Sequence, residues 1–401
     1  MQFLSFVREH ARPLAFGALH AFYSAPGQTF CIGLFIAAIG DSLGMNPAEI
    51  GGLYLAATVG SALTLMFVGQ WIDHVRLVHF SAAVIVGLGI ACLIMASAAG
   101  AFTLFLAFYA LRLTGQGLMV HVEATATARA FERERGRALG VTALGVPLSE
   151  VVFPPLAVAG IAAFGWRPTY ALFGVVALLV LLPLTQWLLS GIRRAPPPGG
   201  HGGGPWRSLV AGLLLLARSR YVWAALPNLA VLPFFVTAVM FHITTIAAAK
   251  GWAPGLVAAS FPASAVAHVV GLFASGYVID RISAKRMFLF QSVPIVLAVA
   301  VLGSFASPWT LPFAFALIGF GAGLAKPVIT AVWAELFGVA SLGTIRSAAA
   351  MYMVLMSATA PFVFGALLEA GVGVDVILVG FAVVGVICLL PPFYAAWRQW
   401  R

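Results

Sequence analysis

The feature that most constrains this chain is a series of apolar runs, each about 20 residues or longer, separated by short segments that carry most of the charges. A helix needs a run of about that length to cross the hydrocarbon core of a bilayer. Charged residues make up 8% of the chain, against about 25% in soluble domains, and the mean hydropathy is +1.03. The sequence therefore predicts an all-α membrane protein.

We expect twelve transmembrane helices, six on each side of a polar break. The first six cover residues 14–40, 49–72, 79–99, 102–128, 138–164 and 167–190. The second six cover residues 221–249, 253–279, 287–305, 309–336, 345–371 and 374–397. Because residues 195–205 are rich in Pro and Gly, they cannot hold a regular helix or strand. The predicted organisation is an N-terminal half (1–190), a cytoplasmic linker (191–220) and a C-terminal half (221–401).

Lys and Arg residues divide unequally between the two sides that these helices imply. With the N-terminus inside, eighteen of the 22 fall in cytoplasmic segments, whereas Arg167 and Lys250 fall outside and Arg112 and Lys326 lie within spans. Such a bias places both termini in the cytoplasm. We therefore expect a multi-pass protein of a bacterial-type inner (plasma) membrane. The net charge of +10 then reads as a topology signal, not as a nucleic-acid surface.

An internal repeat relates the two predicted halves. A shift of 207 residues places Pro47 on Pro254, Gly69 on Gly276 and Asp73 on Asp280, and a shift of 206 places Gly115 on Gly321, Gly117 on Gly323 and Phe131 on Phe337. Two similar halves in the same orientation predict two pseudo-symmetric six-helix bundles.

The repeated loops also carry a family resemblance. The loop after the eighth helix, from Gly276 through Asp280 and Arg281, resembles the signature loop of major facilitator superfamily transporters, and Gly69 and Asp73 keep part of it after the second helix. The resemblance implies a substrate site between the halves. It also implies that Gly69, Asp73, Gly276, Asp280 and Arg281 form a conformational latch at the cytoplasmic gate.

Simple chemistry suggests how this latch would work. A glycine at the end of a helix lets a neighbouring helix approach closely. An aspartate at the same boundary can face the positively polarised N-terminus of an adjacent helix. We therefore expect close packing at Gly69 and Gly276, and helix N-termini beside Asp73 and Asp280.

Charged and polar residues inside the spans are the candidate substrate or coupling residues, because a charge at the bilayer centre costs at least about 2.5 to 3.5 kcal/mol. They are Arg112, Gln116 and Glu123 on one face of the fourth helix, Glu150 on the fifth, Lys326 and Trp333 on the tenth, and Gln28 and Asn228 beside expected helix irregularities. Arg112 and Lys326 have no charged counterpart in the repeat. Structural charge pairing within one half is the alternative interpretation.

Residues 129–140 resemble the loop between the fourth and fifth helices of oxalate/formate and monocarboxylate carriers, which implies an organic anion. The basic residues that bind substrate in that branch are not matched, because the eighth helix offers only His268 and the eleventh offers none after Arg346. The stretch 140–147 is similar to the Gly-Pro signature of antiporters but lacks its terminal glycines.

The leading hypothesis is a secondary transporter of a small organic anion, coupled to protons or working by exchange, with Glu150 as a candidate protonation site. The alternative is a proton antiporter that exports amphipathic compounds through a pocket lined by aromatic residues. An enzyme is not indicated, because no nucleophile and base stand at workable spacing. We expect a monomer in lipid with no cofactor or nucleic-acid partner. Neither a disulfide nor a metal site is indicated, since Cys31, Cys92 and Cys388 sit singly in apolar runs.

Overall fold

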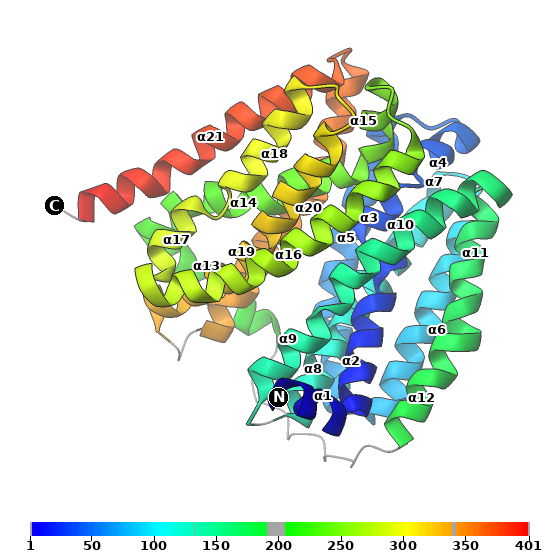
Figure 1. Cartoon of the computed structure of the whole chain (residues 1–401), viewed down its shortest axis with the longest axis horizontal. Helices are drawn as coiled ribbons and strands as arrows, with labels where there is room; N and C mark the ends of the chain where they lie inside the picture. Colours follow the sequence, from blue (N-terminus) through cyan, green and yellow to red (C-terminus); the bar gives the residue numbers. More distant parts are fainter. Residues whose placement is uncertain (1, 132, 191–204, 339–341, 400–401) are drawn as a thin grey trace. The chain divides into compact units, whose positions relative to one another are not determined.

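The computed structural model describes residues 2–131, 133–190, 205–338 and 342–399, and every regular element in these ranges is a helix (Figure 1). Eleven helices are long and apolar enough to cross a membrane, and a broken pair near the N-terminus supplies up to a twelfth. The predicted all-α membrane fold is confirmed for these residues.

The chain divides into two compact units, residues 1–43 with 56–202 and residues 44–55 with 203–401. From the N-terminus to Ser190 the elements are α1 Gln2–Glu9, α2 Ala11–Tyr23, η1 Ala25–Gly27, α3 Thr29–Gly33, α4 Ile36–Leu43, α5 Pro47–Val68, η2 Gly69–Asp73, α6 Leu77–Ala96, α7 Ala101–Leu111, η3 Arg112–Met119, α8 Val120–Ala130, α9 Arg135–Ala143, α10 Gly145–Phe164, α11 Trp166–Val176, η4 Ala177–Leu181 and α12 Leu182–Ser190. From Pro205 onward they are α13 Pro205–Arg218, α14 Arg220–Phe241, α15 Ile243–Ala249, α16 Pro254–Ile282, α17 Ala284–Phe290, α18 Val293–Ser304, α19 Thr310–Phe337, α20 Leu342–Glu369 and α21 Val374–Gln399.

The start of α5 belongs to the second unit, although the sequence analysis counted it in the N-terminal half. Tyr54 packs its ring 4.6 Å from that of Phe241. A Cβ atom added to Gly51 would lie 2.7 Å from the carbonyl oxygen of Pro361 on α20. Within the predicted linker, residues 191–204 lie outside the described ranges, and α13 forms the part that follows them.

The first span is broken where the sequence places Pro26 and Gly27. A short 3₁₀ turn (η1) replaces the α-helix, and Gln28 takes an extended conformation with ψ of 146° before α3 begins. Further along, the segments Ala11–Gly33 and Ile36–Leu43 are bent by 67° relative to each other. The expected irregularity at Gln28 is therefore confirmed.

The irregularity expected beside Asn228 is not found at that position. The helix α14 runs through Pro227 and Pro233 without a break, and the interruption of this span lies at His242. A proline removes one backbone donor and clashes with one carbonyl, and neighbouring helices in a membrane bundle can absorb that defect. At Pro227, unlike at Pro26, the helix therefore continues.

The fourth span contains a π-helical segment, η3, between α7 and α8. Its eight residues, Arg112–Met119, follow a wider spiral than an α-helix, so the face that each residue presents is shifted from the α-helical expectation. Segments of this kind are rare and recur at functional sites. Three of the predicted site residues therefore lie within or just after an irregular helix.

The broken first span and the π-helical segment touch through two glycines. A Cβ atom on Gly27 would overlap the carbonyl oxygen of Leu111 and lie 2.8 Å from the Cα atom of Gly115. A Cβ atom on Gly115 would in turn lie 2.7 Å from the Cα atom of Gly27. Since backbone meets backbone, no side chain can move aside to admit a larger residue.

In the second unit, α16 and α19 lie side by side (Figure 1). Their backbones approach each other as closely as those at Gly27 and Gly115. Cβ atoms on Gly319 and Gly323 would overlap the carbonyl oxygens of Ser264 and His268, respectively. Small residues of this kind let membrane helices pack backbone against backbone. This contact fixes the position of Lys326, one turn further along α19.

The two basic residues that we expect outside the cytoplasm each tie loops together within their own unit. Arg167 donates to the hydroxyl of Ser42 at 2.8 Å and to the carbonyl of Ala98 at 2.9 Å. Lys250 pairs with Asp375 and donates to the carbonyl of Phe305 at 3.1 Å. Both cations therefore have fixed structural partners.

We predict that Gly27→Ala lowers the melting temperature of the purified protein, because overpacking at a backbone contact costs about 1–3 kcal/mol. The matched control is Gly140→Ala on α9, where an added Cβ meets nothing within 4 Å. That control should leave the protein unchanged or slightly more stable. Equal melting temperatures for the two variants would contradict the contact described here.

Candidate functional site

In the first unit, Arg112 opens the π-helical segment and points toward the broken first span. Its side chain is buried, with the residue 6% exposed, and its guanidinium donates to the hydroxyl of Thr29 at 3.2 Å. Thr29 begins α3, directly after the extended Gln28. The close contact of Gly27 and Gly115 brings these two irregular segments together.

Two amides flank this arginine. Gln28 is half-buried and donates from its side chain to the hydroxyl of Ser24 at 3.0 Å. Gln116 is also half-buried, and its side-chain carbonyl oxygen is buried without a hydrogen-bond partner. An unsatisfied buried acceptor of this kind costs about 1–3 kcal/mol. The arrangement therefore supplies a cation, a hydroxyl and a free amide oxygen where two helices lose regular geometry.

The remaining polar residues of the fourth span pack against neighbouring helices. Glu123 is buried and accepts a short hydrogen bond from the hydroxyl of Thr142 on α9. Thr127 follows one turn later. A Cβ atom added to Gly17 on α2 would lie 2.6 Å from its hydroxyl oxygen. The polar stripe therefore runs along the first span, and Glu123 is enclosed between α2 and α9.

Two other predicted residues lie on other helices. Glu150 is half-buried on α10, one turn before Pro154. Asn228 is fully buried on α14, where its side-chain amide donates to the carbonyl of Phe288 at 2.8 Å. The hydrogen bond of Asn228 joins α14 to α17, and its side chain lines neither of the cavities of the second unit described below.

The second unit brings Lys326 and Trp333 together at a cavity of about 200 Å³. Its wall also includes Thr330 of α19 and Arg346 of α20, with Leu232 of α14 on the apolar side. Trp333 is 1% exposed and lines a second, smaller cavity as well, together with Lys285 and Phe288.

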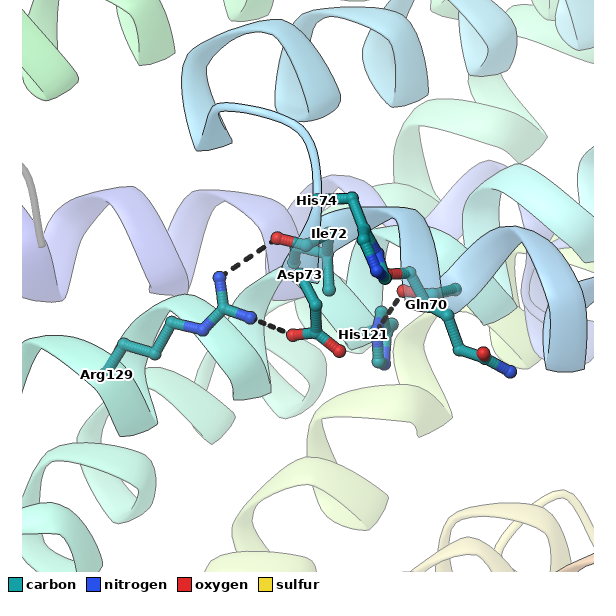
Figure 2. A network of polar contacts seen from close by, with 7 residues as sticks. Gln70, Ile72, Asp73, His74, His121 and Arg129 are labelled. Carbon is teal, nitrogen blue, oxygen red and sulfur yellow. Dashed lines mark hydrogen bonds and ion pairs between the residues drawn. The ribbon is translucent and has the colours of Figure 1, made fainter. Parts of the chain in front are cut away.

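The first latch loop contains an ion pair (Figure 2). Arg129 at the end of α8 pairs with Asp73, and its guanidinium also donates to the carbonyl of Ile72 at 3.0 Å. Beside it, the His121 ring nitrogen lies 3.0 Å from the carbonyl oxygen of Gly69. The carboxylate of Asp73 therefore meets a guanidinium, whereas we had expected a helix N-terminus.

The second latch loop is built differently. Asp280 is exposed and forms no ion pair with any described residue, and Arg281 stacks 4.1 Å above the ring of Tyr277. The acid at a helix N-terminus is Glu335, which accepts from the backbone N–H groups of Ala284 and Lys285 at 2.8 Å and 3.2 Å. Helix-terminal amides attract a carboxylate in this way, but the carboxylate comes from α19.

The latch glycines do not carry the close packing that we expected. A Cβ on Gly276 would meet nothing within 4 Å, and one on Gly69 would lie 3.6 Å from His121, an ordinary contact. The closest backbone approaches lie within the spans instead, as at Gly27 with Gly115 and at Gly319 and Gly323.

The predicted site residues do not include Arg129 and Glu335, which make the contacts at these two loops, and Arg129 stood only as a topology charge. A signal was present, because the shift of 206 that aligns Phe131 with Phe337 also places Arg129 on Glu335. The repeat thus puts a charged residue at the same point of both halves, with opposite sign. Thr29 and Thr142 carried no such signal, since a lone threonine in an apolar run has no distinctive pattern.

Taken together, the geometry defines a polytopic membrane protein with up to twelve spans and a parallel internal repeat. Residues 18–361 match the family model described as Major Facilitator Superfamily. Because the match covers most of its length, the chain belongs to that superfamily. No curated protein is similar enough in sequence to match the chain.

Solved structures of transporters share the fold. A single-residue mutant of the nucleoside transporter NupG has a TM-score of 0.77 at 11% identity, over 95% of this chain and 98% of its own. A bacterial homologue of the human lysosomal transporter Spinster, inward-facing and occupied, has a TM-score of 0.70 at 15% identity, over 99% and 97%. Its unoccupied form is similar, at 0.70 and 14%, over 98% and 97%. These likenesses show a major facilitator transporter fold.

We predict that Arg129→Ala and Asp73→Asn each slow substrate turnover by a factor of up to about five with little change in substrate affinity, because a half-exposed ion pair is worth about 0–1 kcal/mol. Asp280→Asn should have a smaller effect, since it breaks no ion pair. The measurement is transport and binding by the reconstituted single and double variants.

The control for this pair is Glu134→Gln, which removes the exposed ion pair between Glu134 and Arg137 on the neighbouring loop. The double variant of Asp73 and Arg129 should be no slower than either single variant, because both remove the same interaction. Strictly additive losses, or a loss of affinity instead of turnover, would contradict a latch role.

Proposed function

We propose that this chain is a secondary active transporter that moves a small organic anion across the membrane by alternating access. The observation that carries the proposal is the buried Arg112, held where the broken first span meets a π-helical segment. A buried guanidinium presents a rigid fork of donors that matches a carboxylate. A charge retained inside a span marks a functional site by default.

The neighbours of Arg112 support a substrate role. Thr29 and Gln28 lie at the break, where backbone groups are released from the helical pattern. Broken helices commonly form substrate sites in secondary transporters. Gln116 adds a buried carbonyl oxygen that would accept a hydrogen bond from a hydroxyl or amine of the same substrate. The site thus favours an anion that also carries a donor group.

Coupling is assigned to Glu150, a carboxylate half-buried on α10 of the same unit. Protonation would neutralise it, and a carboxylate that gains and loses a proton inside a span is a common relay in transporters. Proton symport and anion exchange both fit this arrangement.

Export of amphipathic compounds is the second candidate. The observation in its favour is the smaller cavity of the second unit, lined by Tyr221, Phe288, Leu289 and Trp333. Apolar and aromatic walls suit ligands with little charge. A transport comparison of carboxylates with neutral amphipathic compounds separates the two.

We place both termini in the cytoplasm of a bacterial-type inner membrane, as the distribution of Lys and Arg favours. Tags at either end should be reached by a membrane-impermeant reagent only after the cells are opened. Labelling of both tags in intact cells would overturn this topology.

We predict that Arg112→Ala abolishes binding of an anionic substrate while the protein still folds and inserts. Arg112→Lys should keep a fraction of the affinity, because the charge remains and the bidentate fork is lost. The measurement is ligand binding, together with the melting temperature of each purified variant. Binding of the anion at wild-type affinity by folded Arg112→Ala would refute the assignment.

The competing interpretation gives Arg112 a fixed partner in Glu150. In that case Arg112→Ala would leave a buried carboxylate uncompensated and lower the melting temperature, and adding Glu150→Gln would restore it. If Arg112 instead meets substrate, Glu150→Gln should change coupling while the melting temperature stays the same. The two single variants and the double variant therefore decide between substrate binding and structural pairing.

A further inference from the structure

The second unit contains a cationic cavity in its own helices, and Arg112 contributes nothing to it. The cavity of about 200 Å³ is lined on α19 by Lys326, Thr330 and Trp333, and on α20 by Arg346 and Met353. Among the described residues on its wall, none is acidic. Two cations therefore face one small space without a carboxylate between them.

Among the described residues, neither Lys326 nor Arg346 takes part in an ion pair or is neutralised by a carboxylate on the cavity wall. The acid nearest along α19, Glu335, is held by the backbone amides at the start of α17. Lys326 and Arg346 are exposed, so water weakens their repulsion, but two like charges on one cavity still disfavour each other. An anion in the cavity would remove that cost.

Trp333 supplies a second and independent observation. Its ring is fully enclosed, yet its indole N–H has no hydrogen-bond acceptor among the described residues. A buried tryptophan usually finds a partner for this group, and leaving it unpaired costs about 1–3 kcal/mol. Trp333 is part of the wall of this cavity and of the smaller one, and an oxygen atom of a bound molecule would supply the acceptor that its N–H group lacks.

We propose that this cavity is an anion-binding station of the second unit, and that its ligand is a small dicarboxylate. Two cations match two carboxylates in charge, and the Trp333 indole N–H would donate to one of their oxygens, whereas the Thr330 hydroxyl already donates to the carbonyl of Lys326 at 3.0 Å. Ala325, Ile329 and Leu232 provide an apolar wall for a short carbon chain. At about 30 Å³ for each water molecule, the volume suits a ligand of only a few carbon atoms.

The internal repeat indicates that Lys326 serves a function of the second unit and is not part of the structure that both units share. Lys326 aligns with Val120, so the first unit has no cation at the matching position. The glycines around Lys326 do recur, since Gly323 aligns with Gly117. The station rests on the proposed function in its choice of an organic anion, but its residues are separate from Arg112.

The test is binding of succinate to the purified full-length protein. Binding is measured by calorimetry and by the ligand-induced rise in melting temperature. Lys326→Met and Arg346→Gln should each weaken binding at least about tenfold, as expected for a lost charge-assisted contact. Trp333→Phe keeps the ring but removes the N–H group, and should weaken binding about threefold to tenfold. The matched control is Lys285→Met, which alters a cation of the neighbouring cavity and should bind normally.

Two analogues of succinate and the Arg112→Ala variant test the proposal further. Butyrate should bind more weakly than succinate, and the neutral diamide of succinate should not bind. In Arg112→Ala protein, succinate binding should persist and then disappear when Lys326→Met is added. Loss of all binding in Arg112→Ala alone would overturn the station while leaving the proposed function intact. Unchanged binding in Lys326→Met, or tighter binding of inorganic phosphate than of succinate, would also overturn it.

Discussion

The cost of holding a guanidinium inside a transmembrane helix is the constraint on which the rest of the first unit depends. Arg112 donates to Thr29, which directly follows the break of the first span at Pro26 and Gly27. The break is possible because Gly27 and Gly115 let two backbones touch. The wider spiral of the π-helical segment carries Arg112 and Gln116 to this junction. Irregular backbone in a membrane persists where protein or a wet cavity satisfies it, so the junction is the natural place for a polar substrate.

The repeat supplies a common frame, and the functional chemistry lies where the halves differ. Gly117 and Gly323 align, yet one faces the side chain of Leu65 while the other touches the backbone of α16. At the aligned positions 129 and 335, an arginine pairs with a carboxylate in one half and a glutamate caps a short helix in the other. Both residues join the end of one span to the loop after another. Residues of opposite charge thus join equivalent segments of the two halves.

Much of the fold could be predicted because its signals are local. Apolar runs marked the spans, and Pro26 with Gly27 marked the break in the first of them. The phase of the fourth span could not be predicted, because its π-helical segment interrupts the α-helical spacing. At Pro227 the sequence suggested a helix irregularity, but α14 continues through this proline without a break. The partners of Asp73 and Glu335, and the missing acceptor of Trp333, depend on contacts between distant segments. Such contacts leave no periodic trace in one sequence.

The central claim is that this member of the Major Facilitator Superfamily carries an organic anion. The most direct measurement is uptake into proteoliposomes containing the purified protein, with carboxylates compared against their neutral amides at matched size. The account predicts saturable uptake or exchange of at least one small carboxylate, and none of its amide. Transport of neutral amphipathic compounds with no carboxylate carried, in the same preparation, would contradict it.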